Sequence, residues 1–368
     1  MILVGPCSSL PTLSEPHKTA LGSPSGRQPK GQPTGGQFAA KSNPEADIEL
    51  EPSQESSASL GAPAEDDEVW SWNAVAKVLG ESARDAWKGK RDPKPFAQQT
   101  ERDQLWRLYQ GDNREVLPRL PDASVNCVVT SPPYYWQRDY GVDGQFGMEP
   151  DIDGFVANLR ETFEGLRHVL TPDGVIFLNL GDTYYSAKGR PHGHDAKHRS
   201  RRLPGLRAVD GPGLGLPRKS LIGIPWRVAL ALQDDGWTLR SDIIWVRNSA
   251  IPEPTAKDRP WRKYEHIFLF SHNPRYLFDR DALEGEEDVW FIEPERNSIA
   301  RGTHYAPYPR ELVRRCVAAG CPEGGVVLDP FVGGGTTMSV ALEMGRSAIG
   351  IELNGDFCGH ISNALTHP

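Results

Sequence analysis

From residue 104 onward, apolar runs of strand character alternate with longer runs of helical periodicity, and this alternation restricts the fold more than any other feature. It predicts an α/β protein with a doubly wound, mostly parallel sheet that binds ligands at the carboxyl ends of its strands. No internal repeat is present. The expected strands are 105–112, 124–134, 174–182, 237–246, 265–271 and 326–329, and the expected helices are 155–170, 224–236 and 309–319.

The first 103 residues lack this alternation. Residues 1–64 are rich in Pro, Gly, Ser and Gln, and such a segment cannot bury enough apolar surface to offset the entropy lost on ordering. We expect a disordered low-complexity tail there. The run 69–90 has helical apolar spacing, so 65–103 is interpreted as a short helical appendage or linker, which either packs on the main domain or binds a partner. The main domain then covers 104–368.

Charge and cysteine content exclude several classes of protein. The formal net charge of −8 argues against a uniformly basic nucleic-acid binder, although a local basic patch can still bind DNA. The five cysteines form no CxxC pair, which argues against a disulfide framework and a thiolate zinc site, so we expect no metal. No apolar run of about 18 residues and no signal-peptide pattern occur, so we expect a cytoplasmic protein without a membrane span.

A glycine loop joins an expected strand at 326–329 to a helix. Gly333, Gly334 and Gly335 let the backbone turn sharply and approach a ligand, and the following helix offers free N–H groups. Glu352 ends the next strand, where a carboxylate can accept hydrogen bonds from ribose hydroxyls. The GxGxxG pattern of dinucleotide-binding folds is not met, because Met338 takes the place of its last glycine. By itself the loop indicates a nucleoside-containing cofactor or merely a glycine-rich connection.

A rigid corner, "TSPPY", ends the strand that begins near residue 124. Proline fixes φ and removes a backbone donor, so two successive prolines after a buried strand hold the chain in one conformation. The corner is either a simple turn or a device that presents polar atoms to a ligand.

Together, "TSPPY" at 130–134 and "DPFVGGGT" at 329–336 resemble the catalytic and cofactor motifs of the amino-methyltransferases of DNA, which methylate an exocyclic base nitrogen with S-adenosylmethionine. The order of the two motifs resembles the beta group of that family. Further segments of this family are similar to residues 111–134, to "DYGVDGQFGMEPD" and to "HYAPYPREL" (304–312). The resemblance therefore covers about 104–364. It implies a seven-stranded, Rossmann-like sheet of the S-adenosylmethionine-dependent methyltransferase type.

The resemblance also assigns roles to single residues. Glu352 would hold the ribose of S-adenosylmethionine and Asp112 would approach its adenine edge, although Asp112 also fits a plain turn after a strand. Asp329 would lie near the amino-acid end, although it also fits a local cap for the turn at Pro330. The remaining cofactor-binding residues that the resemblance implies are Pro330, Phe331, Gly333, Gly335, Thr336, Thr337, His304 and Tyr308.

The proline corner has a chemistry that explains its residues. An exocyclic amine is a weak nucleophile, and acceptors aimed at its protons localise its lone pair and stabilise the developing positive charge. The Ser131 hydroxyl and the Pro132 carbonyl would be these acceptors, Pro133 would fix the backbone, and Tyr134 would stack on the base. The base must flip out of the duplex to arrive there. In this family "SPPY" usually accompanies cytosine N4 and "DPPY" adenine N6, so Ser131 favours cytosine.

DNA contacts are expected in two regions. Residues 186–219 contain nine Lys or Arg and two Asp, a local charge of +7, and follow an expected strand end, so we expect a mobile loop that contacts phosphate, with a merely solvated loop as the alternative. Residues 248–303 include the position at which beta-group enzymes place target recognition. Arg247, just before them, is a further candidate for contact with phosphate or guanine. The DNA-binding candidates are Arg190, Lys197, Arg199, Arg201, Arg202, Arg259 and Arg262.

The predicted function is therefore site-specific methylation of cytosine N4 in double-stranded DNA, in a restriction-modification or epigenetic context. Three alternatives remain: adenine-N6 methylation, a catalytically idle DNA-binding subunit of a restriction complex, and a nicotinamide dehydrogenase, in which the proline corner would have no role. The resemblance allows a cognate restriction endonuclease as partner and implies a bacterial, nucleoid-associated protein. The sequence fits a monomer and a homodimer equally.

Overall fold

The structure, a computed structural model, describes residues 72–88, 93–101, 104–137, 140–185, 191–192, 208–209, 215–247, 256–285, 287–294 and 308–367. The expected tail 1–64 lies outside these residues, as do His304 and most of the basic segment 186–219. No helix in the described part of the chain is both long enough and apolar enough to cross a membrane.

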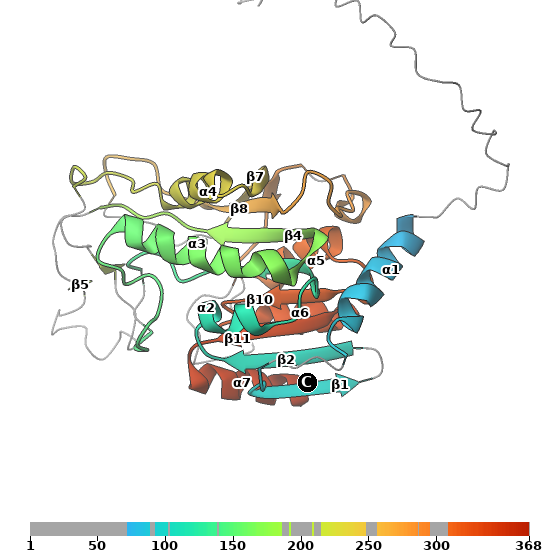
Figure 1. The fold of residues 1–368 in the computed structure, drawn as a ribbon. Helices are drawn as coiled ribbons and strands as arrows, with labels where there is room; N and C mark the ends of the chain where they lie inside the picture. The colour runs from blue at the N-terminus through green and yellow to red at the C-terminus, as the bar shows by residue number, and fades with distance from the viewer. Residues whose placement is uncertain are drawn as a thin grey trace, which may run out of the picture. The chain divides into compact units, whose positions relative to one another are not determined.

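Helices and strands alternate along the chain as the sequence predicts (Figure 1). The helices are α1 (Trp72–Asp85), α2 (Asn113–Val116), α3 (Ile152–Val169), α4 (Ile224–Asp234), α5 (Arg310–Gly320), α6 (Thr336–Glu343) and α7 (Gly355–Thr366), with 3-10 turns at Leu117–Arg119 and Asp281–Leu283. The strands are β1 (Ala97–Glu101), β2 (Gln104–Gln110), β3 (Val125–Thr130), β4 (Leu170–Leu180), β5 (Pro191–His192), β6 (Ala208–Val209), β7 (Thr238–Val246), β8 (Tyr264–Ser271), β9 (Val289–Phe291), β10 (Val326–Asp329) and β11 (Ser347–Glu352).

Nine strands form the main sheet, in the order β1-β2-β11-β10-β3-β4-β8-β7-β9. Neighbours from β2 to β4 pair in parallel, and so do β7 and β9, whereas β1 with β2 and β8 with β4 and β7 pair antiparallel. The mostly parallel α/β class is confirmed. The expected number of seven strands was wrong, because β1 and β9 add to the two edges.

Both edge strands have sequences that do not resemble buried strands. β1 reads AQQTE, and β9 has three residues of which only Trp290 is buried. Side-chain alternation and apolar content therefore could not identify them. β1 also ties residues 97–101 to the main sheet, and the Trp87 indole nitrogen donates to the Ser124 carbonyl at 2.9 Å, so the described part of 65–103 packs on the sheet.

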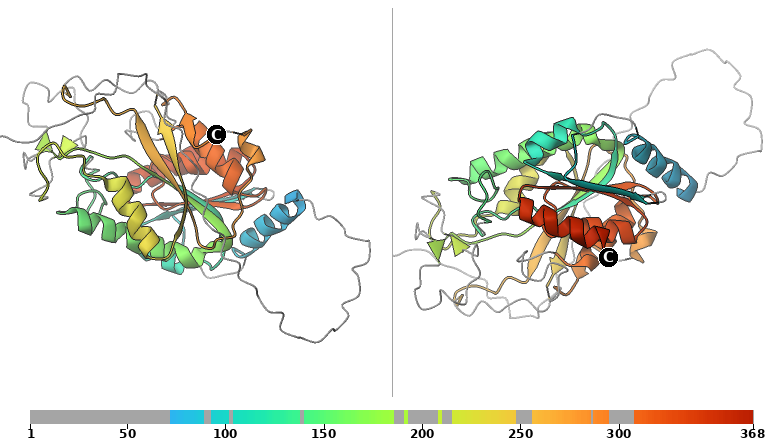
Figure 2. Two further views of the ribbon diagram at one scale, coloured as in Figure 1. Left: turned by 90° about the horizontal axis from the view of Figure 1, so that it is seen from above. Right: turned by 90° about the horizontal axis from the view of Figure 1, so that it is seen from below.

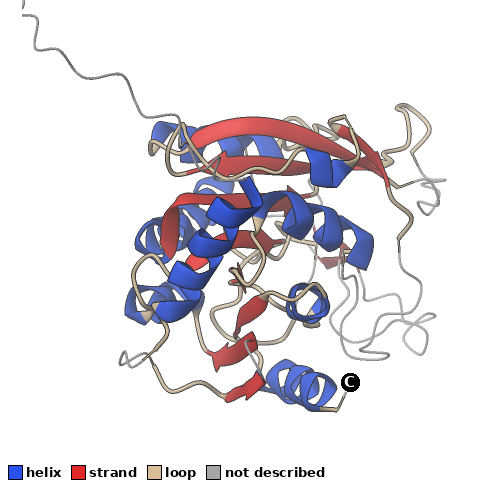
Figure 3. Ribbon diagram, turned by 90° about the vertical axis from the view of Figure 1, so that its right-hand side faces the viewer, coloured by secondary structure: helices blue, strands red, loops and turns tan. Residues whose placement is uncertain are grey.

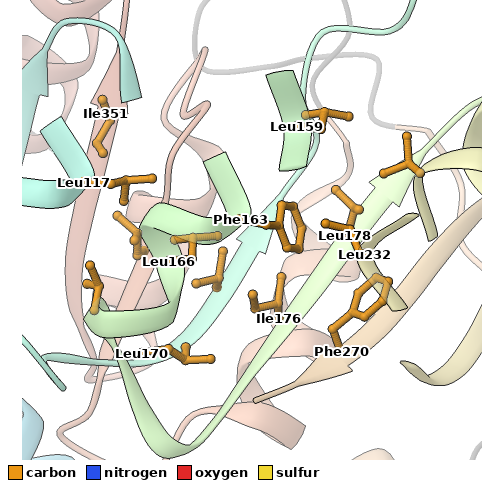
Figure 4. Packing of buried hydrophobic residues seen from close by; sticks show 14 of the residues in the cluster. Leu117, Leu159, Phe163, Leu166, Leu170, Ile176, Leu178, Leu232, Phe270 and Ile351 are labelled. Atoms are coloured by element: carbon orange, nitrogen blue, oxygen red, sulfur yellow. The ribbon is translucent and has the colours of Figure 1, made fainter. Parts of the chain in front are cut away.

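Helices cover both faces of the sheet (Figures 2 and 3). One face packs against α3 and α4. In the core between them, Leu159, Phe163 and Leu166 of α3 interdigitate with Ile176 and Phe270 of the sheet (Figure 4). The other face packs against α5, α6 and α7. Each central strand contributes alternate residues to the two cores, as Val327 and Leu328 of β10 show, so these strands are apolar throughout.

The neighbouring strands β10 and β3 send their helices to opposite faces. α6 follows β10 and packs in the core of α5 and α7, whereas α3 follows β3 and packs with α4. Two adjacent parallel strands that diverge in this way leave a crevice beyond their carboxyl ends, which is where open α/β sheets bind ligands. The glycine loop after Asp329 and the proline corner after Thr130 therefore meet in one place.

Candidate active site

A cavity of about 590 Å³ opens at the carboxyl ends of β10, β3 and their neighbours. This volume lies within the range of about 300–1,000 Å³ typical of cofactor and small-molecule sites. The two expected motifs share it. Fourteen of the residues singled out from the sequence line it: Asp112, Ser131, Pro132, Pro133, Tyr134, Arg247, Tyr308, Asp329, Pro330, Phe331, Gly333, Gly334, Thr336 and Glu352.

Asp329, the first residue of the motif that contains the glycine loop, is only 1% exposed. Its carboxylate accepts hydrogen bonds from the hydroxyls of Thr130 (2.7 Å), Thr337 (2.6 Å) and Tyr308 (2.8 Å), and from the backbone N–H of Phe331 (3.0 Å). Burial raises the pKa of Asp329 even though these donors favour its ionised form. Asp329 thus joins β3, β10, α6 and the segment before α5 at the floor of the crevice.

Thr337 therefore faces Asp329 rather than the cavity, and Tyr308 and Thr337 also contact each other through their hydroxyls. Asp329 does accept from Phe331 N–H, as the local-cap interpretation expects, but three hydroxyls from other elements bind it as well. Asp329 therefore caps its own turn and also links three other elements of the fold.

Glu352 fixes the glycine loop. Its two carboxylate oxygens accept from the backbone N–H groups of Gly333 and Asn354, each at 2.9 Å. Burial raises the pKa of Glu352 to about 7, against the opposing effect of these hydrogen bonds. Gly333 has a φ of 53° and Gly335 a φ of 82°, a region that side chains other than glycine rarely adopt. Gly335, the N-cap of α6, packs against Ile361 and stays outside the lining.

Asp112 caps helix α2. It accepts from the Arg114 backbone N–H at 2.9 Å and pairs with the Arg114 guanidinium at 2.5 Å. Burial opposes its ionisation, but the Arg114 hydrogen bonds and charge outweigh burial and lower the pKa of Asp112. The turn interpretation is confirmed, and the same residue lines the cavity.

Three residues to which no sequence motif pointed complete this side of the cavity. Phe146 meets Phe331 edge-on with 5.1 Å between ring centroids, and Arg114 lies over the Phe146 ring at 4.8 Å. The Asn113 side chain donates to the Pro330 carbonyl at 3.1 Å. Phe146 belongs to the segment after the proline corner, so the aromatic wall has one ring from each motif region.

At the other end of the cavity, the proline corner rests on a buried polar network. The Tyr134 hydroxyl lies 2.5 Å from a carboxylate oxygen of Glu265 and 3.1 Å from the Asn179 side-chain oxygen, to both of which it can donate. The Ser131 hydroxyl donates to the Tyr134 oxygen at 3.4 Å. Since Glu265 can only accept when ionised, the Tyr134 oxygen is left to accept from Ser131, and the Ser131 oxygen keeps its lone pairs for a ligand.

Glu265 and Asn179 were not predicted as part of this site, and Arg247 was predicted only as a candidate for DNA contact. Glu265 is 8% exposed and forms an ion pair with Arg247 at 2.9 Å, and Asn179 is 2% exposed. Burial and the Glu265 charge raise the pKa of Tyr134 well above its usual value, so its hydroxyl keeps its proton. The sequence carried only a weak signal, a glutamate inside the apolar run "EHIFLFS", where a buried charge needs a partner.

The expected DNA-binding residues fall into two groups. Arg190, Lys197, Arg199, Arg201 and Arg202 lie outside the described residues, as does His304 of the cofactor set. Arg259 and Arg262 are described and lie outside the cavity lining, with the Arg259 guanidinium 3.7 Å from the centre of the Tyr184 ring.

The described residues that flank the basic segment 186–219 are held together. The Tyr185 N–H donates to the Ser220 carbonyl at 2.8 Å and the Lys219 N–H to the Tyr185 carbonyl at 2.7 Å. Asp182 accepts from the backbone of Gly223 and Ile224, and its own carbonyl accepts from the side chain of Gln137, a cavity-lining residue. The residues on either side of the segment therefore lie beside the cavity, and within the segment β5 pairs with β6.

Comparison with known proteins places the chain among DNA-modifying enzymes. The N6/N4 methyltransferase family, described as DNA methylase, matches residues 125–363. The type II methyltransferase M.Cfr9I of Citrobacter freundii is 42% identical over 269 residues, which cover 70% of this chain and 87% of the relative. M.SmaI of Serratia marcescens is 40% identical over 262 residues, covering 68% and 87%.

Solved structures show the same fold. The PvuII DNA methyltransferase (cytosine-N4-specific) matches with a TM-score of 0.55 and 20% identity, over 70% of this chain and 85% of that protein. A putative DNA modification methylase of Thermus thermophilus, solved in complex with S-adenosyl-L-methionine, matches with a TM-score of 0.50 and 24% identity, over 71% and 93%.

Proposed function

Because the chain belongs to the N6/N4 family of DNA methylases, we propose that it methylates the exocyclic N4 amine of a flipped cytosine in double-stranded DNA, with S-adenosylmethionine as methyl donor. One observation carries this proposal: a single cavity is lined at one end by the glycine loop with Glu352 and at the other by Ser131, Pro132 and Tyr134. A donor and an acceptor of the methyl group can therefore lie side by side.

The residues at the glycine-loop end fit S-adenosylmethionine. Glu352 offers carboxylate oxygens to the ribose hydroxyls, and Phe331 and Phe146 offer an aromatic wall to the adenine. Asp112 lines the same end and offers an acceptor for the adenine edge. Pro330, Thr336 and Tyr308, with Asp329 beneath them, line the remaining methionine side. When bound, the cofactor supplies a methyl group on a positively charged sulfur.

The proline corner prepares the acceptor. The Ser131 oxygen and the Pro132 carbonyl accept the two amine protons of cytosine, which localises the nitrogen lone pair and stabilises the positive charge that develops on it. Tyr134 supplies the stacking ring for the flipped base, whose unstacking costs about a few kcal/mol. No strong base is needed, since the amine proton can leave after transfer.

Serine at position 131 supports cytosine as the substrate, and adenine N6 is the second candidate. DNA methylated in vitro by the purified protein should yield N4-methylcytosine on digestion to nucleosides and mass spectrometry. N6-methyladenine as the sole product would replace the proposal with the second candidate. Absence of any labelled methyl in the DNA would favour an idle DNA-binding subunit instead.

The DNA partner is proposed to contact the basic segment 186–219. Its charge of +7, from nine basic and two acidic residues, suits phosphate, and the residues that flank it lie beside the cavity. Because the relatives are named type II methyltransferases, a cognate restriction endonuclease is the proposed functional partner. With these partners, the proposed location of the protein is the bacterial nucleoid.

Affinity for S-adenosylmethionine should depend on the ionisation of Glu352. Its pKa is raised to about 7 by burial, and the ribose hydroxyls need the ionised form as acceptor. Affinity should therefore fall as pH falls through 7, by about tenfold between pH 8 and pH 6 if the ribose keeps Glu352 ionised in the complex. Isothermal titration calorimetry at several pH values measures this, and Glu352→Gln should abolish the dependence. A flat profile for the unmodified protein would contradict the role of Glu352.

Gly181 leaves the space that the Tyr134 ring occupies. A Cβ atom at 181 would lie 2.5 Å from Tyr134 Cε2, and the ring is anchored by its hydroxyl to Glu265. Gly181→Ala should therefore displace the ring and lower turnover by about tenfold, with unchanged cofactor affinity. Steady-state methyl transfer and calorimetry measure the two effects.

Gly359→Ala is the matched control for Gly181→Ala. Gly359 lies in α7, and a Cβ there would meet nothing within 4 Å, so turnover should be unchanged and stability slightly higher. Full activity of Gly181→Ala would show that the position of the Tyr134 ring does not matter.

A further inference from the structure

Arg247 directly follows β7 and lines the base end of the cavity together with Trp245 and Glu265. Its backbone N–H donates to the Lys263 carbonyl at 2.7 Å, which continues the pairing of β7 with β8. Its side chain is 24% exposed and one terminal nitrogen, Nη1, lies 2.9 Å from Glu265. Glu265 in turn contacts the Tyr134 hydroxyl, which accepts from Ser131, so Arg247 shares a continuous network with the corner.

The other edge of the Arg247 guanidinium has an unused donor. Its Nε is buried and has no hydrogen-bond partner among the described residues. Leaving a buried donor unpaired costs about 1–3 kcal/mol, so such a group in a cavity wall suggests a ligand that satisfies it. In a guanidinium whose Nη1 is engaged, the Nε–H and the neighbouring Nη2–H form a parallel pair of donors.

Cytosine carries two adjacent acceptors that suit such a pair. Its ring nitrogen N3 and its carbonyl oxygen O2 lie side by side, and N3 is also next to the carbon that bears the N4 amine. An amine held by Ser131 and Pro132 therefore directs N3 and O2 along the cavity wall. Adenine presents one acceptor, N1, beside its amine, and then a C–H group where cytosine has O2.

We propose that Arg247 is a specificity-determining residue that donates from its Nε–H and Nη2–H edge to N3 and O2 of the flipped cytosine. Glu265 holds the guanidinium through Nη1 and neutralises its charge, which suits a neutral base. One ion pair thereby couples recognition of the base to the orientation of Tyr134 and Ser131. This inference rests on the proposed cytosine-N4 activity.

Base analogues in a synthetic duplex test the contact. The duplex carries the sequence context mapped by sequencing DNA methylated by the unmodified enzyme, with either cytosine or 3-deazacytosine at the target position. The analogue keeps the amine and O2 but has a C–H in place of N3. Single-turnover transfer of labelled methyl is measured for the unmodified enzyme and for Arg247→Lys, which keeps the charge beside Glu265 and lacks the paired edge.

We expect Arg247→Lys to slow transfer to cytosine by about 10–100-fold, as for loss of a hydrogen bond from a charged donor. The preference for cytosine over 3-deazacytosine should also fall by about tenfold or more, because the variant has lost the donor that N3 satisfies. The altered nucleophilicity of the analogue affects both enzymes alike and cancels in this comparison. Arg240→Lys, an exposed change on β7 beside Tyr276, is the matched control and should keep the full preference.

If Arg247→Lys slowed transfer to both substrates equally, its preference for cytosine over 3-deazacytosine would be unchanged. That result would overturn the proposal and show that the role of Arg247 is only structural. If Arg247→Lys does not fold, the double variant Arg247→Met with Glu265→Gln, which leaves no unpaired charge, is judged by the same ratio. Failure of the proposed function has a different signature, since the unmodified enzyme would then transfer no methyl to cytosine at all.

Discussion

Replacing Ser131 with alanine should lower the rate of methyl transfer by about 10²–10³-fold and leave the dissociation constant of S-adenosylmethionine nearly unchanged, by analogy with the loss of one oxyanion-hole donor. The Ser131 hydroxyl lines the base end of the cavity, and its proton is directed toward the Tyr134 oxygen at 3.4 Å. The alanine variant keeps the two prolines and the strand before them, so it removes one acceptor for the amine and little else.

Single-turnover transfer of labelled methyl to DNA, paired with calorimetric titration of the cofactor, separates the two quantities. Ser362→Ala, on helix α7 and outside the cavity lining, is the matched control and should behave like the unmodified protein. Equal losses in cofactor affinity and in turnover would contradict the role of Ser131 as an acceptor for the base.

Replacing Asp329 with alanine should lower the free energy of unfolding by about 2–4 kcal/mol, because it strands several buried donors at once. Three hydroxyls and one backbone N–H converge on this carboxylate from separate elements. Loss of that junction should also loosen the turn at Phe331, so we expect cofactor affinity to fall by at least about tenfold. Denaturant unfolding and calorimetry measure the two effects.

Asp329→Asn is the graded variant, because it keeps the shape and one acceptor oxygen, and it should lose less stability than Asp329→Ala. Asp153→Ala, an exposed change in the first turn of α3, controls for loss of a carboxylate and should cost no more than about 1 kcal/mol. If the free energy of unfolding of Asp329→Ala lay within about 0.5 kcal/mol of that of the unmodified protein, the hydroxyls would have found other partners.

Local patterns predicted most of the secondary structure. The apolar spacing of 155–170 corresponds to α3 at Ile152–Val169, and 309–319 corresponds to α5 at Arg310–Gly320. Both depend on the apolar periodicity of a single segment, which is visible in the sequence alone. The meeting of the two motifs was also predictable, since the carboxyl ends of parallel strands share one edge of the sheet.

The environment of the proline corner was not predictable in the same way. Glu265 lies 131 residues beyond Tyr134 in the chain, and Asn179 lies 45 residues beyond it. Their approach depends on the order in which β3, β4, β8 and β7 pair, and no pattern within one strand encodes that order. Gly181 is similar, because the sequence shows a glycine after a strand, whereas the structure shows the space it leaves for an aromatic ring.

The α/β class and the central strands could be predicted from the sequence, as could the residues of the corner and the glycine loop, because each depends on neighbours along the chain. The folded structure was needed to find the edge strands β1 and β9, the junction at Asp329 and the Arg247–Glu265–Tyr134 network. Edge strands have too little apolar alternation to be recognised. Buried polar groups acquire their partners only when distant strands come into register, so their roles become visible only in the folded protein.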